Sequence, residues 1–144
     1  MIIPDINVLV HAYNSDSPRH PAARRWWEHT LSTPHAVGLP WVSILGFIRV
    51  MTHRGIMANP MYPAAATERV QQWLGVPTVN IITPGERHAH ILFGFLQALG
   101  TAGNLTTDAH LASLAVEYRA ELASTDSDFT RFSGLRWVNP LIDR

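Results

Sequence analysis

The sequence predicts an α/β protein in which helices cover both faces of a mostly parallel sheet. Short apolar runs typical of strands alternate along the chain with longer runs that carry helix signals. Strands that alternate with helices form parallel crossover units, and such units build three layers, helix over sheet over helix. A length of 144 residues fits one domain with its own core, so we expect a single domain spanning residues 1–144.

The predicted strands are five short apolar segments. They cover residues 1–5, 36–39, 78–82, 121–124 and 135–138. The first ends at a carboxylate, Asp5, and its Pro4 suits the end of a strand better than the middle. In a parallel sheet the carboxyl ends of the strands gather at one edge, where ligands bind. Side chains that directly follow these strands are therefore candidates for a functional site.

The predicted helices are five longer segments. They cover residues 18–31, 41–53, 64–74, 83–99 and 106–118. Pro40 precedes the second helix, and Gly75 and Gly100 follow the third and fourth, as is common at helix ends. The fourth begins with the sequence TPGE (83–86), in which a Thr cap, a Pro and a Glu three residues later predict a capping box. Thr106 or Thr107 is expected to cap the fifth helix.

Composition excludes several classes of site. The chain has no Cys, so it has no disulfide, no Cys-ligated zinc and no thiol nucleophile. Eleven basic residues balance eleven acidic ones, which gives no argument for a nucleic-acid partner and none against it. No apolar run approaches the ~18 residues of a membrane span, and Asp and Asn interrupt the apolar first segment. We therefore expect a cytoplasmic protein without a membrane segment.

Four aspartates are positioned to meet at the predicted sheet edge. Asp5, Asp126 and Asp128 come at or after strand ends, and Asp108 begins a helix. Carboxylates ~4 Å apart repel by roughly 4 kcal/mol per pair at an effective dielectric near 20, unless a cation or protonation offsets the charge. Mg²⁺ and Mn²⁺ prefer oxygen ligands and keep several waters. Such an ion suits phosphodiester hydrolysis, because it activates water and offsets charge on the phosphate.

A purely structural interpretation of the same aspartates stays open on local pattern alone. Asp108 suits the first turn of a helix, where its charge interacts favourably with the macrodipole. Asp126 and Asp128 suit a turn, where Asp is common. Strand-end aspartates of this kind are structural in many α/β folds.

Three segments resemble the motifs of one nuclease family. They are DINVLV (5–10), NLTTDAHLASLAVEY (104–118) and ASTDSDFTRFSGLRWVNPL (123–141). They resemble the opening, central and closing motifs of PIN-domain nucleases, and within that family those of VapC-type toxins. A single motif would be a weak signal, whereas three in the right order at family-like spacing are specific.

The resemblance implies a Mg²⁺- or Mn²⁺-dependent endoribonuclease that cuts structured RNA, with a cognate antitoxin that covers the site and a homodimeric state. Carried over by position, the catalytic acids would be Asp5, Asp108, Asp126 and Asp128, and the first three of them the metal ligands. Asn7 would position Asp5 or the substrate. Ser124 stands where the family has a Thr or Ser hydroxyl that supports the acidic cluster.

One position departs from the family pattern of Glu, two hydrophobics and Arg. Here that pattern is GFIR (46–49), so Gly46 replaces the Glu while Arg49 keeps its place. Two explanations are open: Gly46 leaves room that a water fills, or the site depends more on Asp126 and Asp128. Arg49 is expected to reach a phosphate or the acidic cluster. His110, two residues after Asp108, is a candidate phosphate contact or an ordinary helix residue.

Other aromatic and histidine positions have simpler interpretations. His88 and His90 are two residues apart on a predicted helix and point ~200° apart, so they cannot chelate one ion, and we expect both at the surface. Trp26 and Trp27 are adjacent on a helix and cannot face the same core, so they are interface candidates.

Two further functions compete with the ribonuclease. The missing Glu at position 46 motivates a catalytically weakened PIN-like module that binds RNA or a partner protein, although the four retained aspartates favour an enzyme. A flap-type DNA nuclease of related fold would need an added arch or DNA-clamping segment, for which the chain is too short. The sequence contains neither a Gly-x-Ser-x-Gly elbow nor a phosphate-binding Gly-rich loop.

Overall fold

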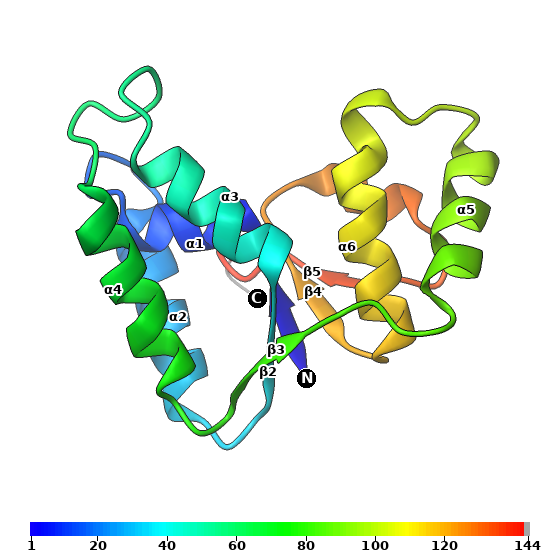
Figure 1. The fold of residues 1–144 in the computed structure, drawn as a ribbon, viewed down its shortest axis with the longest axis horizontal. Helices are drawn as coiled ribbons and strands as arrows, with labels where there is room; N and C mark the ends of the chain where they lie inside the picture. The colour runs from blue at the N-terminus through cyan, green and yellow to red at the C-terminus, as the bar shows by residue number, and fades with distance from the viewer. Residues whose placement is uncertain (143–144) are drawn as a thin grey trace.

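A five-stranded sheet forms the centre of the computed structural model, which describes residues 1–142 (Figure 1). Its strands are β1 (Ile2–Pro4), β2 (Val37–Pro40), β3 (Val79–Ile82), β4 (Glu121–Ala123) and β5 (Arg136–Val138). The strand order is β3-β2-β1-β4-β5, and every neighbouring pair is parallel. The predicted parallel sheet is confirmed, and β1 lies at its middle.

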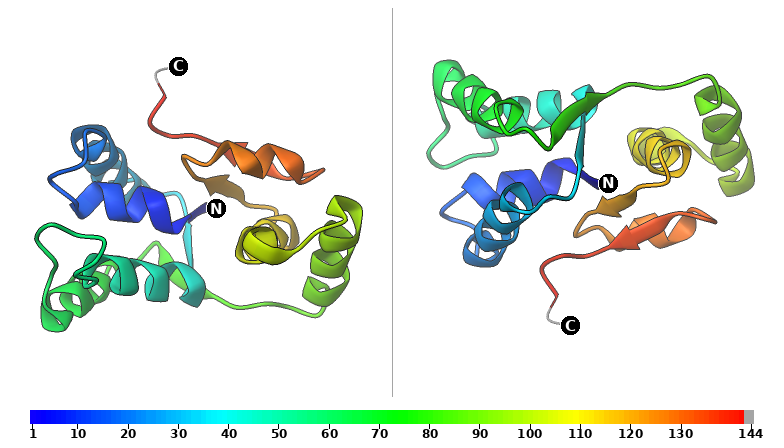
Figure 2. Two further views of the ribbon diagram at one scale, coloured as in Figure 1. Left: turned by 90° about the horizontal axis from the view of Figure 1, so that it is seen from above. Right: turned by 90° about the horizontal axis from the view of Figure 1, so that it is seen from below.

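Within residues 1–142, six α-helices flank the sheet, which confirms the predicted three-layer architecture. They are α1 (Ile6–Tyr13), α2 (His20–Ser32), α3 (Trp41–Met51), α4 (Pro63–Leu74), α5 (His88–Leu99) and α6 (Thr106–Glu117). Figures 1 and 2 show α1 to α4 gathered on one side of the sheet and α5 with α6 on the other. Among residues 1–142, no helix is both long and apolar enough to cross a membrane.

Helix α1 is the element that the sequence pattern did not reveal. It begins directly after β1, and Asp5 caps it, because the Asp5 Oδ1 accepts from the Ile6 backbone N–H at 2.7 Å. The apolar residues of the DINVLV motif are therefore helical. Three of them, Val8, Leu9 and Val10, are buried in the core. The carboxylate that ends the first strand is held in place by the first turn of this helix.

The start of α5 corrects the predicted capping box. The helix begins at His88 rather than at Thr83, and the TPGE segment is a loop. Its Gly85 and Arg87 backbone N–H groups donate to the Glu117 carboxylate at 2.8 and 2.9 Å. Glu117, at the end of α6, thus supplies the acceptors that a local box would have supplied. The Thr cap predicted for α6 is also wrong, because Leu105 holds the cap position without a side-chain bond.

An aromatic cluster forms the core between the sheet and α1 to α4. The ring centroids of Phe47 and Trp73 are 4.7 Å apart, and those of Trp27 and Trp73 are 5.5 Å apart in an edge-on arrangement. Trp73 Nε1 donates to the Tyr13 hydroxyl at 2.8 Å. Trp27 is fully buried, so its expected place at an interface is wrong, while Trp26 is partly buried beside it. A second apolar core lies between the sheet and α6.

Candidate active site

The adjacent strands β1 and β4 bring the two ends of the chain to one site. Pro4 pairs with Ala123 in the parallel register, and the Asp5 backbone N–H donates to the Ala123 carbonyl at 2.9 Å. The next residue on each strand, Asp5 and Ser124, therefore sits at the same level of the sheet edge. This placement follows directly from the parallel topology.

Ser124 is the centre of a hydrogen-bond network. The side chain is fully buried, and its hydroxyl donates to Asp5 Oδ2 at 2.7 Å. The same Oγ accepts from Asn7 Nδ2 at 3.2 Å and from the Asp126 backbone N–H at 3.0 Å. Asn7 in turn accepts from the Thr125 backbone N–H at 3.2 Å. The start of α1 and the segment after β4 are thus tied together around the Asp5 carboxylate.

Three of the predicted acids line a single cleft of about 320 Å³. Asp5 comes from the end of β1, Asp108 from the first turn of α6, and Asp126 from the segment after β4. The complete lining is Asp5, Ile6, Asn7, Val10, His11, Val50, Asp108 and Asp126. Asp128 does not line the cleft within the described chain. It is exposed, and its backbone N–H donates to Asp126 Oδ1 at 2.9 Å.

The carboxylates in the cleft act on one another electrostatically. The pKa of Asp108 is raised from 3.8 to about 6, mainly by burial and secondly by the charges of Asp5, Asp126 and Asp128. Burial also raises the pKa of Asp5, against the hydrogen bonds from Ser124 and Ile6 that lower it. The cleft therefore concentrates negative charge that the surrounding groups do not neutralise.

The donor set fits a hard divalent cation in its chemistry. Carboxylate oxygens at a partly open cleft are the ligands that Mg²⁺ and Mn²⁺ prefer. A cation would also relieve the repulsion that raises the pKa of Asp108. As the side chains stand, no three His, Asp or Glu residues in the described chain converge closely enough to hold an ion. The acids are thus gathered in one cleft but not drawn together onto a single point.

Gly46 does not leave room for a water, so that explanation of the missing Glu is wrong. A Cβ at position 46 would collide with Cδ1 and Cγ1 of Ile6, which fill the space beside the α3 backbone. Gly46 is buried, and α1 and α3 pack closely at this point. Ile6, the variable residue of the Asp-x-Asn motif, occupies the place where a side chain from α3 would enter.

Two supporting candidates lie away from the cleft. Arg49 is exposed on α3, and the residue that α3 presents to the cleft is its neighbour Val50. His110 pairs with His88, whose Nε2 lies 3.0 Å from His110 Nδ1. The expectation that His88 lies at the surface is wrong: it is only 8% exposed, because α5 begins there and packs on α6.

His11 lines the cleft and was missed from the sequence. It lies four residues after Asn7 on α1, which places both on one face of the helix. The signal that would have found it is a helix assignment for residues 6–13 with Asp5 as its cap. Unless residues 6–13 are assigned to a helix, the sequence does not indicate that His11 lies on the same face as Asn7.

The comparisons with known proteins agree on one family. The model of the PIN domain matches residues 2–135. Ribonuclease VapC33 of Mycobacterium tuberculosis is 43% identical over 141 residues, which are 98% of this chain and 99% of that protein. Ribonuclease VapC37 of the same organism is 45% identical over 140 residues, 97% of each chain. This chain belongs to the VapC ribonucleases of the PIN-domain family.

Solved VapC structures share the fold at low sequence identity. VapBC2 from Rickettsia felis, bound to a DNA fragment from its promoter, superposes with a TM-score of 0.70 at 17% identity, covering 96% of this chain and 98% of that one. Mycobacterium tuberculosis VapC20, described as a sarcin-ricin loop cleaving toxin, gives a TM-score of 0.68 at 17% identity, covering 94% and 99%. These likenesses show that the chain shares the fold of these structures.

Proposed function

We propose that this chain is an endoribonuclease toxin that uses Mg²⁺ or Mn²⁺ to cleave structured RNA. The observation that carries the proposal is the cleft in which Asp5, Asp108 and Asp126 meet from three separate elements. Mutual repulsion contributes to the raised pKa of Asp108, which is the electrostatic environment that a divalent cation stabilises. VapC20, named for cleaving the sarcin-ricin loop, supports structured RNA as the substrate class.

In this mechanism each residue of the network has a defined task. Asp5, Asp108 and Asp126 would hold the cation, which when bound supplies activation of a water and charge neutralisation at the phosphate. Ser124 and Asn7 hold the Asp5 carboxylate in one orientation through their hydrogen bonds. Asp128, outside the cleft, adds negative charge behind Asp126 and strengthens the attraction for a cation. Arg49, exposed beside Val50, is the candidate contact for RNA phosphate further along the rim.

A catalytically weakened PIN-like module remains the alternative. The observation that favours it is the filled space at Gly46, which excludes a further acid from α3. The supported network around Asp5 favours the enzyme, because a hydroxyl and an amide both serve to orient one carboxylate.

Removal of divalent metal is expected to stop RNA cleavage, and re-addition of Mg²⁺ or Mn²⁺ to restore it. The physical reason is that Asp5, Asp108 and Asp126 would hold the cation, and the cation would supply the activation of water that the acids alone do not. The measurement is cleavage of total RNA by the purified protein, with and without a chelator, followed by metal titration. Cleavage that persists in the chelator would contradict the metal mechanism. Failure to cleave with any metal would favour the binding module.

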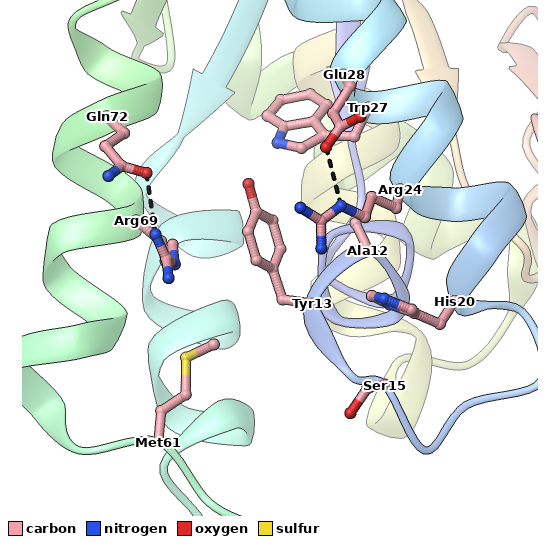
Figure 3. A pocket seen from close by; sticks show the side chains of 10 residues that line it. All are labelled: Ala12, Tyr13, Ser15, His20, Arg24, Trp27, Glu28, Met61, Arg69 and Gln72. Atoms are coloured by element: carbon pink, nitrogen blue, oxygen red, sulfur yellow. Dashed lines mark hydrogen bonds and ion pairs between the residues drawn. The ribbon is translucent and has the colours of Figure 1, made fainter.

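We further propose that a cognate antitoxin binds a second cavity, of about 360 Å³, between α1, α2 and α4. Figure 3 shows Tyr13 of α1 between Arg24 of α2 and Arg69 of α4. The Trp27 Nε1, at the back of this cavity, is buried without a hydrogen-bond partner among the described residues. The Arg24 guanidinium is paired with the Glu28 carboxylate at 2.9 Å, so Arg69 is the guanidinium of this cavity that favours a carbonyl- or carboxylate-bearing peptide. The likeness to VapBC2 supports such a partner.

Arg69→Glu is therefore expected to weaken the complex with the antitoxin. The substitution places a negative charge in a cavity that presents N–H donors, while Arg69 itself bonds only the exposed Gln72, at 3.3 Å, among the described residues. The measurement is co-purification with the product of an adjacent gene encoding a small DNA-binding protein. Arg54→Glu, in the loop before α4, is the control and should bind normally. Equal binding by both variants would contradict this location.

The homodimer implied by the family resemblance stays a prediction. Its support in this chain is a set of large apolar side chains that remain exposed on α3, α5 and the edge strand β3. They are Trp41, Leu45, Ile81 and Phe93. Burial of these side chains against a second copy would remove apolar area from water.

A further inference from the structure

His11 has no role in the proposed mechanism, although it lines the same cleft as the three acids. It lies one helical turn beyond Asn7 on α1, and the cleft wall there continues to Val50 of α3. It is partly buried. A polar ring beside the acidic cleft therefore needs an explanation of its own.

The His11 ring is held from behind by the turn between α1 and α2. Its Nδ1 lies 2.8 Å from the Ser17 hydroxyl, and that hydroxyl also accepts from the Arg19 backbone N–H at 3.1 Å. The His11 carbonyl accepts from His20 Nδ1 at 2.9 Å. These bonds fix both the backbone and one ring nitrogen. Nε2 has no hydrogen-bond partner within residues 1–142, so it is the ring nitrogen left for a ligand in the cleft.

The neutral His11 ring has a tautomer in which Nε2 is the hydrogen-bond donor. Ser17 Oγ accepts from the Arg19 backbone N–H, and its own hydroxyl proton is available to His11 Nδ1. When Ser17 donates to Nδ1 in this way, the proton of the neutral ring is on Nε2. Burial, and secondly the charge of Arg19, lower the pKa of His11, which keeps the ring neutral near pH 7.

The cleft is otherwise poor in donors for an anionic substrate. The ionised carboxylates of Asp5, Asp108 and Asp126 only accept hydrogen bonds. Among the lining residues of the described chain, Asn7 is the other side chain with N–H groups, and its bonds to Ser124 and Thr125 hold it in the wall. An RNA phosphate that approaches this cleft needs a donor to offset repulsion by the acids.

We propose that His11 binds a phosphate oxygen of the RNA through its Nε2–H and is thus a substrate-binding residue of this cleft. The proposal rests on the proposed cleavage of RNA. In this proposal α1 contributes His11 to the site in addition to Asn7, which lies one helical turn earlier. Ser17 is then a positioning residue that acts through the ring.

Amide isosteres separate a substrate contact from a structural role. His11→Gln places an amide nitrogen near the position of Nε2, whereas His11→Asn places one near Nδ1, where it can still bond Ser17. His11→Ala removes both. KM and kcat for RNA cleavage, RNA affinity in Ca²⁺ and Mn²⁺ affinity are measured for each variant. His35→Ala, exposed before β2, is the matched control.

We expect His11→Ala and His11→Asn to raise KM and weaken RNA binding by roughly tenfold, as loss of one hydrogen bond to a charged group does. His11→Gln should recover most of that loss, and Mn²⁺ affinity should not change in any variant. Wild-type kinetics for His11→Ala would overturn the proposal while leaving the ribonuclease function standing. Near-normal RNA affinity for His11→Asn but not for His11→Gln would also overturn the proposal. That result would mean that His11 acts through its bond to Ser17 and not through a contact with RNA. Failure of the wild-type protein to bind or cleave RNA would overturn both.

Discussion

Asp108→Asn is expected to abolish RNA cleavage and at the same time to stabilise the metal-free protein at pH 7. The carboxylate is partly buried beside Asp5 and Asp126, and its pKa is raised to about 6. At pH 7 its ionisation costs more free energy in the folded state than in the unfolded chain. An amide removes that cost but gives up a metal ligand. After allowance for solvent screening, the expected gain in the free energy of unfolding is about 1 kcal/mol.

The gain should depend on pH in a defined direction. A carboxyl group with a raised folded pKa binds its proton more tightly in the folded state than in the unfolded state, so the wild-type protein loses stability as pH rises between 3.8 and about 6. The full cost is present above pH 6, and it is absent below pH 3.8, where both states are protonated. The advantage of Asp108→Asn should therefore be complete at pH 7, should decrease as the pH falls from about 6 to 3.8, and should be largely lost at pH 4.

Urea unfolding in the presence of a chelator at pH 7 and pH 4, together with cleavage of RNA in Mg²⁺, measures both effects. Asp16→Asn is the control, because Asp16 is exposed in the turn before α2 and should change neither quantity. Saturating Mg²⁺ should remove the stability advantage of Asp108→Asn. The ion stabilises the wild-type protein by binding to its folded state, whereas the variant lacks one of the proposed ligands. Full cleavage by Asp108→Asn, or a loss of stability at pH 7, would contradict the assignment of Asp108 to a charged metal site.

Gly46→Ala is expected to lower the free energy of unfolding by about 1–3 kcal/mol. In an open helix the same change would stabilise by roughly 1 kcal/mol, because Ala is the better helix former. At position 46 the added methyl group collides with Ile6 Cδ1 and Cγ1, and Ile6 is packed between α1 and α3. A Glu at this position would meet the same obstruction with a larger side chain, so Gly46→Glu should not recreate the family carboxylate.

Gly94→Ala is the matched control, because Gly94 lies in the middle of α5 and a Cβ there would have nothing within 4 Å. It should stabilise the protein, whereas Gly46→Ala should destabilise it, as measured by urea unfolding. In the Ile6→Ala background, Gly46→Ala should lower the free energy of unfolding little further. The double-mutant cycle should therefore give a favourable coupling energy between positions 6 and 46. Equal gains from the two Gly→Ala changes would show that α1 and α3 are not in tight contact.

The convergence of Asp5 and Asp126 could be predicted because the parallel sheet determines where strand ends lie. A carboxylate after each of two neighbouring strands must reach the same edge, and the structure brings Asp5 and Asp126 to one cleft for this reason. Local propensity also identified the segments of all five strands and of α2, α3, α4 and α6. Their ends differ from the predicted bounds by a few residues at most.

What the sequence did not reveal depends on contacts between distant segments. The eight-residue helix α1 is short and apolar on most of its surface, so its pattern resembles a buried strand. Thr83 and Glu86 have the sequence of a capping box, but Glu117 provides the acceptors from 30 residues or more away. The filling of the Gly46 space by Ile6 likewise requires the packing of α1 on α3. His11 was missed as a consequence of α1.

The bond from Ser124 to Asp5 joins residues that are 119 positions apart in the chain. A ribosome that has synthesised the first hundred residues has therefore made Asp5 and Asn7, but neither the hydroxyl that orients Asp5 nor any of the other three acids. The proposed nuclease centre can therefore be assembled only after β4 has left the ribosome and paired with β1. A chain that ends before β4 lacks Ser124 and Asp126, so we expect it to be inactive on RNA.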